Sequence, residues 1–333
     1  MKSNQVVVSG MRPTGLLHLG HYFGVLKNWV QLQEKFRCYF FVADWHSLTT
    51  EYAQIDVIQK TMREIVIDWV ACGIDPEKSV LFVQSRVPEH AELHLLLSMI
   101  TPISWLERVP SYKELRQELK GKDLSMYGFL GYPLLQTADV AIYKATQVPV
   151  GQDQAAHIEL AREILRRFNF LYCGDKPLFP EPQTLMTNYP KVPGIDGRKM
   201  SKSYNNTITL SDSEEAANKK IMQCITDPAR IKREIPGNPD VCTVFSYHKL
   251  VTGEGEKKEI DRDCRSAALG CVDCKKKLIR NMTAELAPFR KRRLEIAKAP
   301  EKIDKILENG NAAARKVAAV TLAEVNRAMG LEK

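Results

Sequence analysis

Short runs of β-branched and aromatic residues alternate with longer stretches of helical spacing through the first half of the chain. The strand-like runs cover residues 5–9, 37–43, 79–85 and 147–150, and the helical stretches cover 20–35 and 56–72. This alternation is typical of βα units, in which helices connect the strands of a parallel sheet. Gly73 stands where a helix C-cap favours glycine. The pattern therefore predicts a doubly wound α/β domain.

The chain changes character after a proline-rich connection. Residues 177–193 contain five prolines and little periodicity, which predicts an irregular segment. Farther on the strand signals fade, and helical patterns cover 214–224, 267–280, 284–297 and 312–329. Ser211 and Glu214 have the spacing of a capping box, and Pro288 is expected to break or kink the third of these helices. A second, helical domain is therefore expected.

Charge and hydropathy bear on the partners and the compartment. The 333-residue chain has a formal net charge of +8, which suits a polyanionic partner without requiring one. Residues 275–298 hold nine Lys and Arg, so this stretch is either a solvated helix face or a surface for a nucleic acid backbone. No run reaches the length of a signal or membrane-spanning segment. We expect a cytoplasmic protein without a membrane partner.

A glycine-rich loop follows the first predicted strand. Gly10, Gly15 and Gly20 let the backbone approach a ligand, and the helix that starts near Gly20 offers free N–H groups to phosphate. His18 and His21 are three residues apart, so both can project the same way and donate to phosphate oxygens. The alternative is that one or both histidines only cap the helix.

A second phosphate-suited segment lies at residues 196–203, which are basic and rich in hydroxyl groups. Residues 18–21 match the HIGH signature and residues 199–203 read KMSKS, so the chain resembles the class I aminoacyl-tRNA synthetases. The resemblance implies that an amino-acid carboxylate attacks the α-phosphate of ATP, with pyrophosphate leaving, and that the aminoacyl group is then transferred to the 3′ adenosine of tRNA. Lys199 and Lys202 would neutralise charge on the departing pyrophosphate together with Mg²⁺.

In the same resemblance, His18 and His21 would hold phosphate and ribose. No protein nucleophile is needed, so catalysis would consist of positioning and charge stabilisation.

Three polar side chains mark a candidate amino-acid pocket. Tyr132, Gln136 and Asp139 lie four and three residues apart, which places them on one face of a helix with Pro133 near its start. A ring, an amide and a carboxylate in an apolar pocket would suit an aromatic side chain. The alternative is a capped surface helix.

This helix, the segment at residues 43–46 and the segment at 148–154 resemble the bacterial tryptophanyl-tRNA synthetase family. The resemblance implies that Asp139 accepts the indole N–H, that Tyr132 and Gln154 bind the amino-acid end, and that His46 borders the pocket, with Gln136 beside it. The family's ATP-binding positions correspond to Arg12, Pro13, Thr14, Gly20, His21, Gly151, Gln152, Asp153, Val192, Lys199, Met200, Ser201, Lys202 and Ser203. The implied partners are tryptophan, ATP and tRNA(Trp), and the implied assembly is a homodimer.

Two residues depart from the family pattern. Gln136 stands where many bacterial members have Met, and Gln152 replaces the usual Glu of a G-E-D-Q string. Because Gln136 and Asp139 could also clamp a phenol hydroxyl, a tyrosyl-tRNA synthetase stays open as an alternative. The SGMRPTG and ADWH strings favour the tryptophanyl family.

Four cysteines cluster late in the sequence, with the form C-x21-C-x6-C-x2-C. Cys242, Cys264, Cys271 and Cys274 could close a zinc site, hold an iron–sulfur cluster or stay as unligated thiols. A subset of tryptophanyl enzymes has a very similar pattern and binds a 4Fe-4S cluster, which makes that cluster the implied cofactor. The other cysteines, Cys38, Cys72, Cys173 and Cys224, are expected to be packing residues.

The resemblance implies a doubly wound, Rossmann-type α/β catalytic domain over residues 1–204, followed by a helical anticodon-binding domain over 205–333. A synthetase that has lost catalysis and only binds tRNA or regulates is a rival, which the retention of both signatures disfavours. An iron–sulfur oxidoreductase would need a G-x-G-x-x-G string after a strand, and the sequence has none.

Overall fold

The computed structural model describes residues 5–110, 125–151, 154–186 and 192–331. Within them, five strands form one parallel sheet in the order β3-β2-β1-β4-β5. The strands are β1 (Val6–Met11), β2 (Arg37–Val42), β3 (Ser79–Val83), β4 (Gln147–Val150) and β5 (Gln183–Met186). The four strands predicted from the sequence are confirmed to within two residues at each end. The fifth corrects the prediction of an irregular segment at 177–193, because pairing with β4 makes four residues between prolines a strand.

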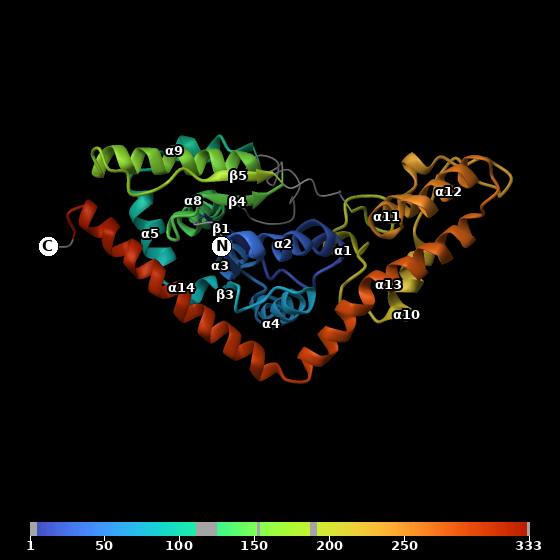
Figure 1. The fold of residues 1–333 in the computed structure, drawn as a ribbon. Helices are drawn as coiled ribbons and strands as arrows, with labels where there is room; N and C mark the ends of the chain where they lie inside the picture. Colours follow the sequence, from blue (N-terminus) through green and yellow to red (C-terminus); the bar gives the residue numbers. More distant parts are fainter. Residues whose placement is uncertain (1–4, 111–124, 152–153, 187–191, 332–333) are drawn as a thin grey trace.

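The order of the strands determines where a ligand can bind. β2 and β3 lie on one side of the central β1, and β4 and β5 lie on the other. The connections after β1 and β4 therefore leave in opposite directions, which opens a crevice at the carboxyl ends of these strands. Helices cover both faces of the sheet (Figure 1).

The helices around the sheet include those predicted at 20–35 and 56–72 and the one that carries Asp139, together with others that sequence analysis did not predict. They are α1 (Leu19–His21), η1 (Tyr22–Leu26), α2 (Lys27–Lys35), α3 (Asp44–Glu51), α4 (Ile55–Cys72), η2 (Gln84–Arg86), α5 (Glu89–Ser98), α6 (Ile103–Glu107), α8 (Tyr127–Ala141) and α9 (Ala155–Tyr172). The stretch predicted at 20–35 contains a π-helical turn, η1, which helical spacing does not reveal. Gly73 ends α4 with φ of 108°, as its position predicted.

The rest of the described chain is helical, as expected. It contains η4 (Lys202–Tyr204), α10 (Glu214–Gln223), η5 (Pro239–Val241), α11 (Thr243–Val251), α12 (Glu254–Arg265), α13 (Cys271–Ala297) and α14 (Pro300–Ala328). In the described ranges, no helix combines the length and the apolar character needed to cross a membrane.

The predicted helix cap at Ser211 is wrong, and so is the predicted break at Pro288. Ser213, not Ser211, caps α10, because its hydroxyl accepts from the backbone N–H of Ala216 at 3.1 Å. Pro288 does not break its helix, since the patterns at 267–280 and 284–297 are replaced by one helix from 271 to 297. Leu286 and Phe289 flank the proline and are almost completely buried, so packing outweighs the lost hydrogen bond.

The helices α13 and α14 form the two arms of a V around the sheet domain (Figure 1). Arg292 donates to the carbonyl of Ala71 at 2.6 Å, and Arg293 pairs with the buried Asp68 at 2.7 Å, so basic residues of α13 anchor it to α4. Part of the basic run at 275–298 therefore binds its own chain. These contacts do not distinguish a solvated helix face from a surface that binds RNA.

The edge strand β3 is covered by α14 at a very close approach. Asn311 accepts from the backbone N–H of Val83 at 2.9 Å, which satisfies a donor that an edge strand leaves unpaired. A Cβ at Gly310 would lie 1.7 Å from the carbonyl oxygen of Leu81. Only glycine lets the two backbones meet here.

We therefore expect Gly310→Ala to destabilise the chain by at least about 1–3 kcal/mol, because helix and strand must separate to admit the methyl group. Thermal unfolding of the purified variant measures this loss. Gly255→Ala is the matched control, since a Cβ there meets nothing within 4 Å and alanine favours the helix. Equal melting temperatures for the two variants would contradict the proposed steric role of Gly310.

Candidate active site

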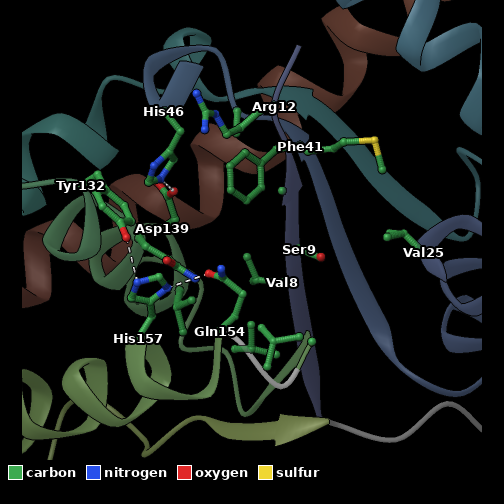
Figure 2. Close-up of a pocket in the computed structure, with 18 of the residues that line it drawn as sticks. Val8, Ser9, Arg12, Val25, Phe41, His46, Tyr132, Asp139, Gln154 and His157 are labelled. Atoms are coloured by element: carbon green, nitrogen blue, oxygen red, sulfur yellow. Dashed lines mark hydrogen bonds and ion pairs between the residues drawn. The ribbon is translucent and has the colours of Figure 1, made fainter. Parts of the chain in front are cut away.

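A cavity of about 460 Å³ opens at the crevice between β1 and β4. Its walls come from β1, β2, α3, α8, β4 and the start of α9, as Figure 2 shows for many of these side chains. The residues predicted for ATP or amino-acid binding that line it are Arg12, Thr14, His21, His46, Tyr132, Gln136, Asp139, Gly151 and Gln154. Residues predicted from segments far apart in the sequence thus line a single cavity.

The remaining predicted positions are distributed differently. Pro13, His18, Gly20, Val192, Lys199, Met200, Ser201 and Lys202 do not line this cavity. Gln152 and Asp153 lie outside the described residues, as does the side chain of Ser203. Val192 and Met200 are buried in the hydrophobic core, and Lys199 is exposed.

Asp139 is the most constrained carboxylate of the cavity. It is 1% exposed, and it accepts from His46 Nε2 at 2.8 Å and from His90 Nδ1 at 2.7 Å. Gln84 Nε2 lies 2.8 and 2.9 Å from its two oxygens. Burial alone would raise the pKa of Asp139, but the hydrogen bonds from the two histidines hold that pKa at about 2. The carboxylate is therefore ionised at neutral pH.

The helix that carries Asp139 differs from its prediction in two ways. Pro133 lies inside α8 rather than near its start, because α8 already begins at Tyr127. The helix is also not a surface element, since Pro133, Thr137 and Asp139 are all buried.

A second chain of polar side chains, Tyr132, His157 and Gln154, lies near Asp139 (Figure 2). Tyr132 Oη lies 2.9 Å from His157 Nε2, and His157 Nδ1 lies 2.6 Å from Gln154 Oε1. Because the amide oxygen can only accept, His157 donates through Nδ1, and a neutral ring then accepts from Tyr132. A phenol oxygen can also accept from a donor such as an ammonium group. Sequence analysis missed His157, although its position one helical turn after Gln154 could have indicated it.

The two histidines of the glycine-rich loop cap α1, as the alternative interpretation held. His18 Nδ1 accepts from the N–H of Gly20 at 3.1 Å, and His21 Nδ1 accepts from the N–H of His18 at 3.2 Å. Burial lowers the pKa of His18 to about 4 and that of His21 well below its usual value. Both rings are therefore neutral near pH 7, and each keeps an Nε2–H free of capping that can donate to a ligand.

The KMSKS segment docks on the same loop. Lys202 Nζ donates to the carbonyl of Gly15 at 2.6 Å, and Gly15 has φ of 128°, in the region that favours glycine. Burial, and then the nearby charge of Arg12, lower the pKa of Lys202 to about 8. The two phosphate-suited segments, 187 residues apart between Gly15 and Lys202, thus come together.

Asn206, which sequence analysis missed, holds the turn of this segment. It accepts from the backbone N–H of Ser201 at 2.8 Å and donates to Asp196 at 2.7 Å, and its own side chain is 2% exposed. The turn is therefore shaped by a buried amide outside the KMSKS string.

The four clustered cysteines lie at the far end of the helical region, around η5, α12 and the start of α13 (Figure 1). Burial first, and then the neighbouring Cys242, Cys264 and Cys271, raise the pKa of Cys274 to about 12. The four thiols are thus close enough to influence one another. Among the described residues, no three His, Cys, Asp or Glu side chains are placed to hold a single metal ion. Of the other cysteines, Cys38 and Cys224 are buried, whereas Cys72 and Cys173 are half-buried.

A family model described as "tRNA synthetases class I (W and Y)" matches residues 1–287. The chain is therefore a class I tRNA synthetase by its family, in agreement with its fold and site. The chain is 54% identical to the tryptophan–tRNA ligase of Thermotoga maritima, over 98% of this chain and 99% of that protein. It is 45% identical to the tryptophan–tRNA ligase of Aquifex aeolicus, again over 98% and 99%. The chain belongs to the tryptophan–tRNA ligase family.

A solved structure agrees with this assignment. The crystal structure of tryptophanyl-tRNA synthetase from Campylobacter jejuni, complexed with ADP and tryptophane, is 33% identical and has a TM-score of 0.87 to this chain. The match covers 98% of this chain and 100% of that one. The likeness therefore includes both the parallel sheet and the helical region.

Proposed function

We propose that the chain activates tryptophan with ATP to form tryptophanyl-adenylate and transfers the tryptophanyl group to tRNA(Trp). The observation that carries the specificity is the ionised, buried carboxylate of Asp139 in the wall of an otherwise largely apolar cavity. A buried acceptor of this kind rejects ligands that bring no donor, because the carboxylate would lose a partner. The indole N–H supplies that donor.

The other side chains then have distinct roles. Tyr132 and Gln154 bind the amino-acid end, His46 and Gln136 border the ring, and the loop from Arg12 to His21 binds ATP. The tryptophan carboxylate attacks the α-phosphate in line, and pyrophosphate leaves, so positioning and charge carry the catalysis. Lys202 and Lys199 stabilise the charge on pyrophosphate, while the Nε2–H groups of His18 and His21 donate to ATP. Mg²⁺ bound with ATP would neutralise further phosphate charge.

Pyrophosphate exchange into ATP, measured with each of the twenty amino acids, tests this function. We expect exchange with tryptophan and little with the other nineteen. Exchange with tyrosine instead would favour the tyrosyl alternative, which the pair Gln136 and Asp139 keeps open. Exchange with no amino acid would favour a protein that has lost catalysis and only binds tRNA.

We propose that Cys242, Cys264, Cys271 and Cys274 hold a 4Fe-4S cluster. In a zinc site, all four sulfurs coordinate one ion, each at about 2.3 Å from the metal. In a cubane each thiolate binds a different iron, and the sulfurs stand farther apart. Cys242, Cys264 and Cys271 are close enough to Cys274 to raise its pKa, which four ligands of one group require. Arg230 Nη1 lies 3.8 Å from Cys264 Sγ and is buried, which suits an anionic cluster.

Anaerobically purified protein is expected to be brown and to contain about four irons per chain, the stoichiometry of a cubane on four thiolates. Iron analysis and the visible absorption spectrum measure this. Colourless protein with one tightly held zinc would replace the cluster with a zinc site, and protein without metal would leave four thiols.

Replacing Cys271 with Ser should reduce tRNA charging more than tryptophan activation, because the cysteines lie far from the cavity. The two reactions are measured separately, by aminoacylation and by pyrophosphate exchange. Cys173→Ser, at a half-buried thiol outside the cluster, is the matched control and should leave both unchanged. Equal loss of both reactions in Cys271→Ser would assign the cysteines to the stability of the whole fold.

Three further proposals follow from the family. The boundary near residue 204 would separate a catalytic domain, which holds all five described strands, from an anticodon-binding domain of helices. The protein would act as a homodimer. It would work in the cytoplasm, where tRNA is charged for protein synthesis.

A further inference from the structure

His90 is a fully buried histidine that lies behind Asp139, a residue of the cavity wall. It lies on α5, is 0% exposed and does not line the cavity. Its Nδ1 is 2.7 Å from Asp139 Oδ1, and its Nε2 is 2.7 Å from Tyr143 Oη. The imidazole therefore bridges the cavity's carboxylate and a buried phenol that no motif indicated.

The hydrogen bonds to Asp139 can be counted against its capacity. A carboxylate offers about four acceptor sites on its two oxygens. His90 occupies one on Oδ1, His46 occupies one on Oδ2, and Gln84 Nε2 lies between the two oxygens. Three donors leave about one site, and Asp139 itself lines the cavity beside His46 (Figure 2). The free site suits a single ligand N–H.

Tyr143 determines which nitrogen of His90 carries the proton. Burial raises the pKa of Tyr143 well above its usual value, so the phenol stays protonated and can donate to Nε2. An imidazole that accepts from Tyr143 through Nε2 has its proton on Nδ1, facing Asp139. The opposite tautomer would turn a lone pair toward the carboxylate.

We propose that His90, held by Tyr143, is a positioning residue that fixes Asp139 as an oriented acceptor with one site left for the ring N–H of tryptophan. The inference rests on the proposed function, since it assigns Asp139 to tryptophan. It adds that discrimination against aromatic amino acids without a ring donor depends on a residue outside the cavity. Gln84 supports the same carboxylate from η2.

The pH response of Asp139 depends on every group that faces it. His46 faces it from α3, His90 and His94 from α5, and Gln84 from η2, while Tyr143 and Glu89 lie behind His90. Removing a donor to the ionised form raises the pKa of a carboxylate, and burial acts in the same direction. Without His90, Asp139 should therefore protonate at a higher pH, and tryptophan use should decline earlier on acidification.

Two substitutions of His90 separate its hydrogen bond from its bulk. His90→Leu removes the donor, whereas His90→Asn places an amide N–H near the position of Nδ1. Pyrophosphate exchange with tryptophan and phenylalanine gives the ratio of kcat/KM for the two substrates, and a pH series gives the acid limb for tryptophan. His90→Leu should lower the ratio about 10- to 100-fold, mainly through KM for tryptophan. Its acid limb should move to higher pH.

His90→Asn should recover most of the ratio, and Tyr143→Phe should lower it less than His90→Leu does. Gln33→Leu is the matched control, because Gln33 is 2% exposed and bonded to Gly73 and Asp75, away from the cavity. It should lower the melting temperature without changing the ratio. A folded His90→Leu protein with an unchanged ratio and acid limb would overturn the inference, as would equal losses with both substrates.

The proposed function can fail separately. If Asp139→Asn leaves the ratio unchanged, Asp139 does not recognise tryptophan, and both the function of Asp139 and the inference are wrong. If Asp139→Asn collapses the ratio and His90→Leu does not, only the inference is wrong.

Discussion

Lys202→Ala is expected to slow tryptophanyl-adenylate formation by roughly 30- to 1,000-fold, or about 2–4 kcal/mol, while tryptophan affinity changes little. The reason is that Lys202 places a half-buried cation against the glycine-rich loop, where we propose that the charge of pyrophosphate develops. A charge that acts mainly in the transition state affects rate more than ground-state binding. Single-turnover adenylate formation and equilibrium tryptophan binding measure the two effects.

The same lysine predicts an alkaline limb. Burial lowers the pKa of Lys202 to about 8, so its ammonium is charged below that pH and neutral above it. In the free enzyme, kcat/KM for ATP should therefore fall as pH rises through about 8. Lys202→Arg should remove this limb, because a guanidinium stays charged. Lys305→Ala, on the exposed side of α14, is the control for the loss of a lysine. Equal losses of adenylate formation and of tryptophan binding in Lys202→Ala would contradict the assignment.

The sequence predicted those parts of the fold that carry local signals. The strand at 147–150 and the C-cap at Gly73 were predictable because β-branched residues and a left-handed glycine act within a few residues. The strand β5 was not, because only pairing with β4 makes its four residues a strand. The continuity of α13 through Pro288 depends on the burial of Leu286 and Phe289 against distant elements. Long-range packing decided each of these points.

The candidate site divides in the same way. Its motif residues came from short strings with known chemistry, and the structure brings many of them to one cavity. His90 and Gln84 could not be predicted, since they lie 49 and 55 residues from Asp139 and in no motif. A string can indicate a carboxylate, but the donors that orient it come from other elements. The hydrogen bonds that keep Asp139 ionised are therefore a property of the fold.

Asp139→Asn is expected to lower kcat/KM for tryptophan by about 3–5 kcal/mol, or roughly 150- to 5,000-fold. The substitution keeps the size of the side chain but replaces one acceptor oxygen with an NH₂ group. That NH₂ group must face donors, because His46, His90 and Gln84 all donate toward this position. The variant thus loses the charged acceptor for the indole N–H and also leaves a buried donor unpaired.

Phenylalanine brings no ring donor, so its already weak activation should fall far less, and the ratio of kcat/KM for tryptophan over phenylalanine should collapse. Pyrophosphate exchange with both amino acids measures this ratio. Gln136→Met is the matched control on the same helix face, one turn away and also lining the cavity. It removes the amide that a phenol clamp would need, so a tryptophan enzyme should keep its ratio within a few-fold. If Gln136→Met abolishes the preference for tryptophan over phenylalanine while Asp139→Asn preserves it, then Gln136 rather than Asp139 recognises the ring.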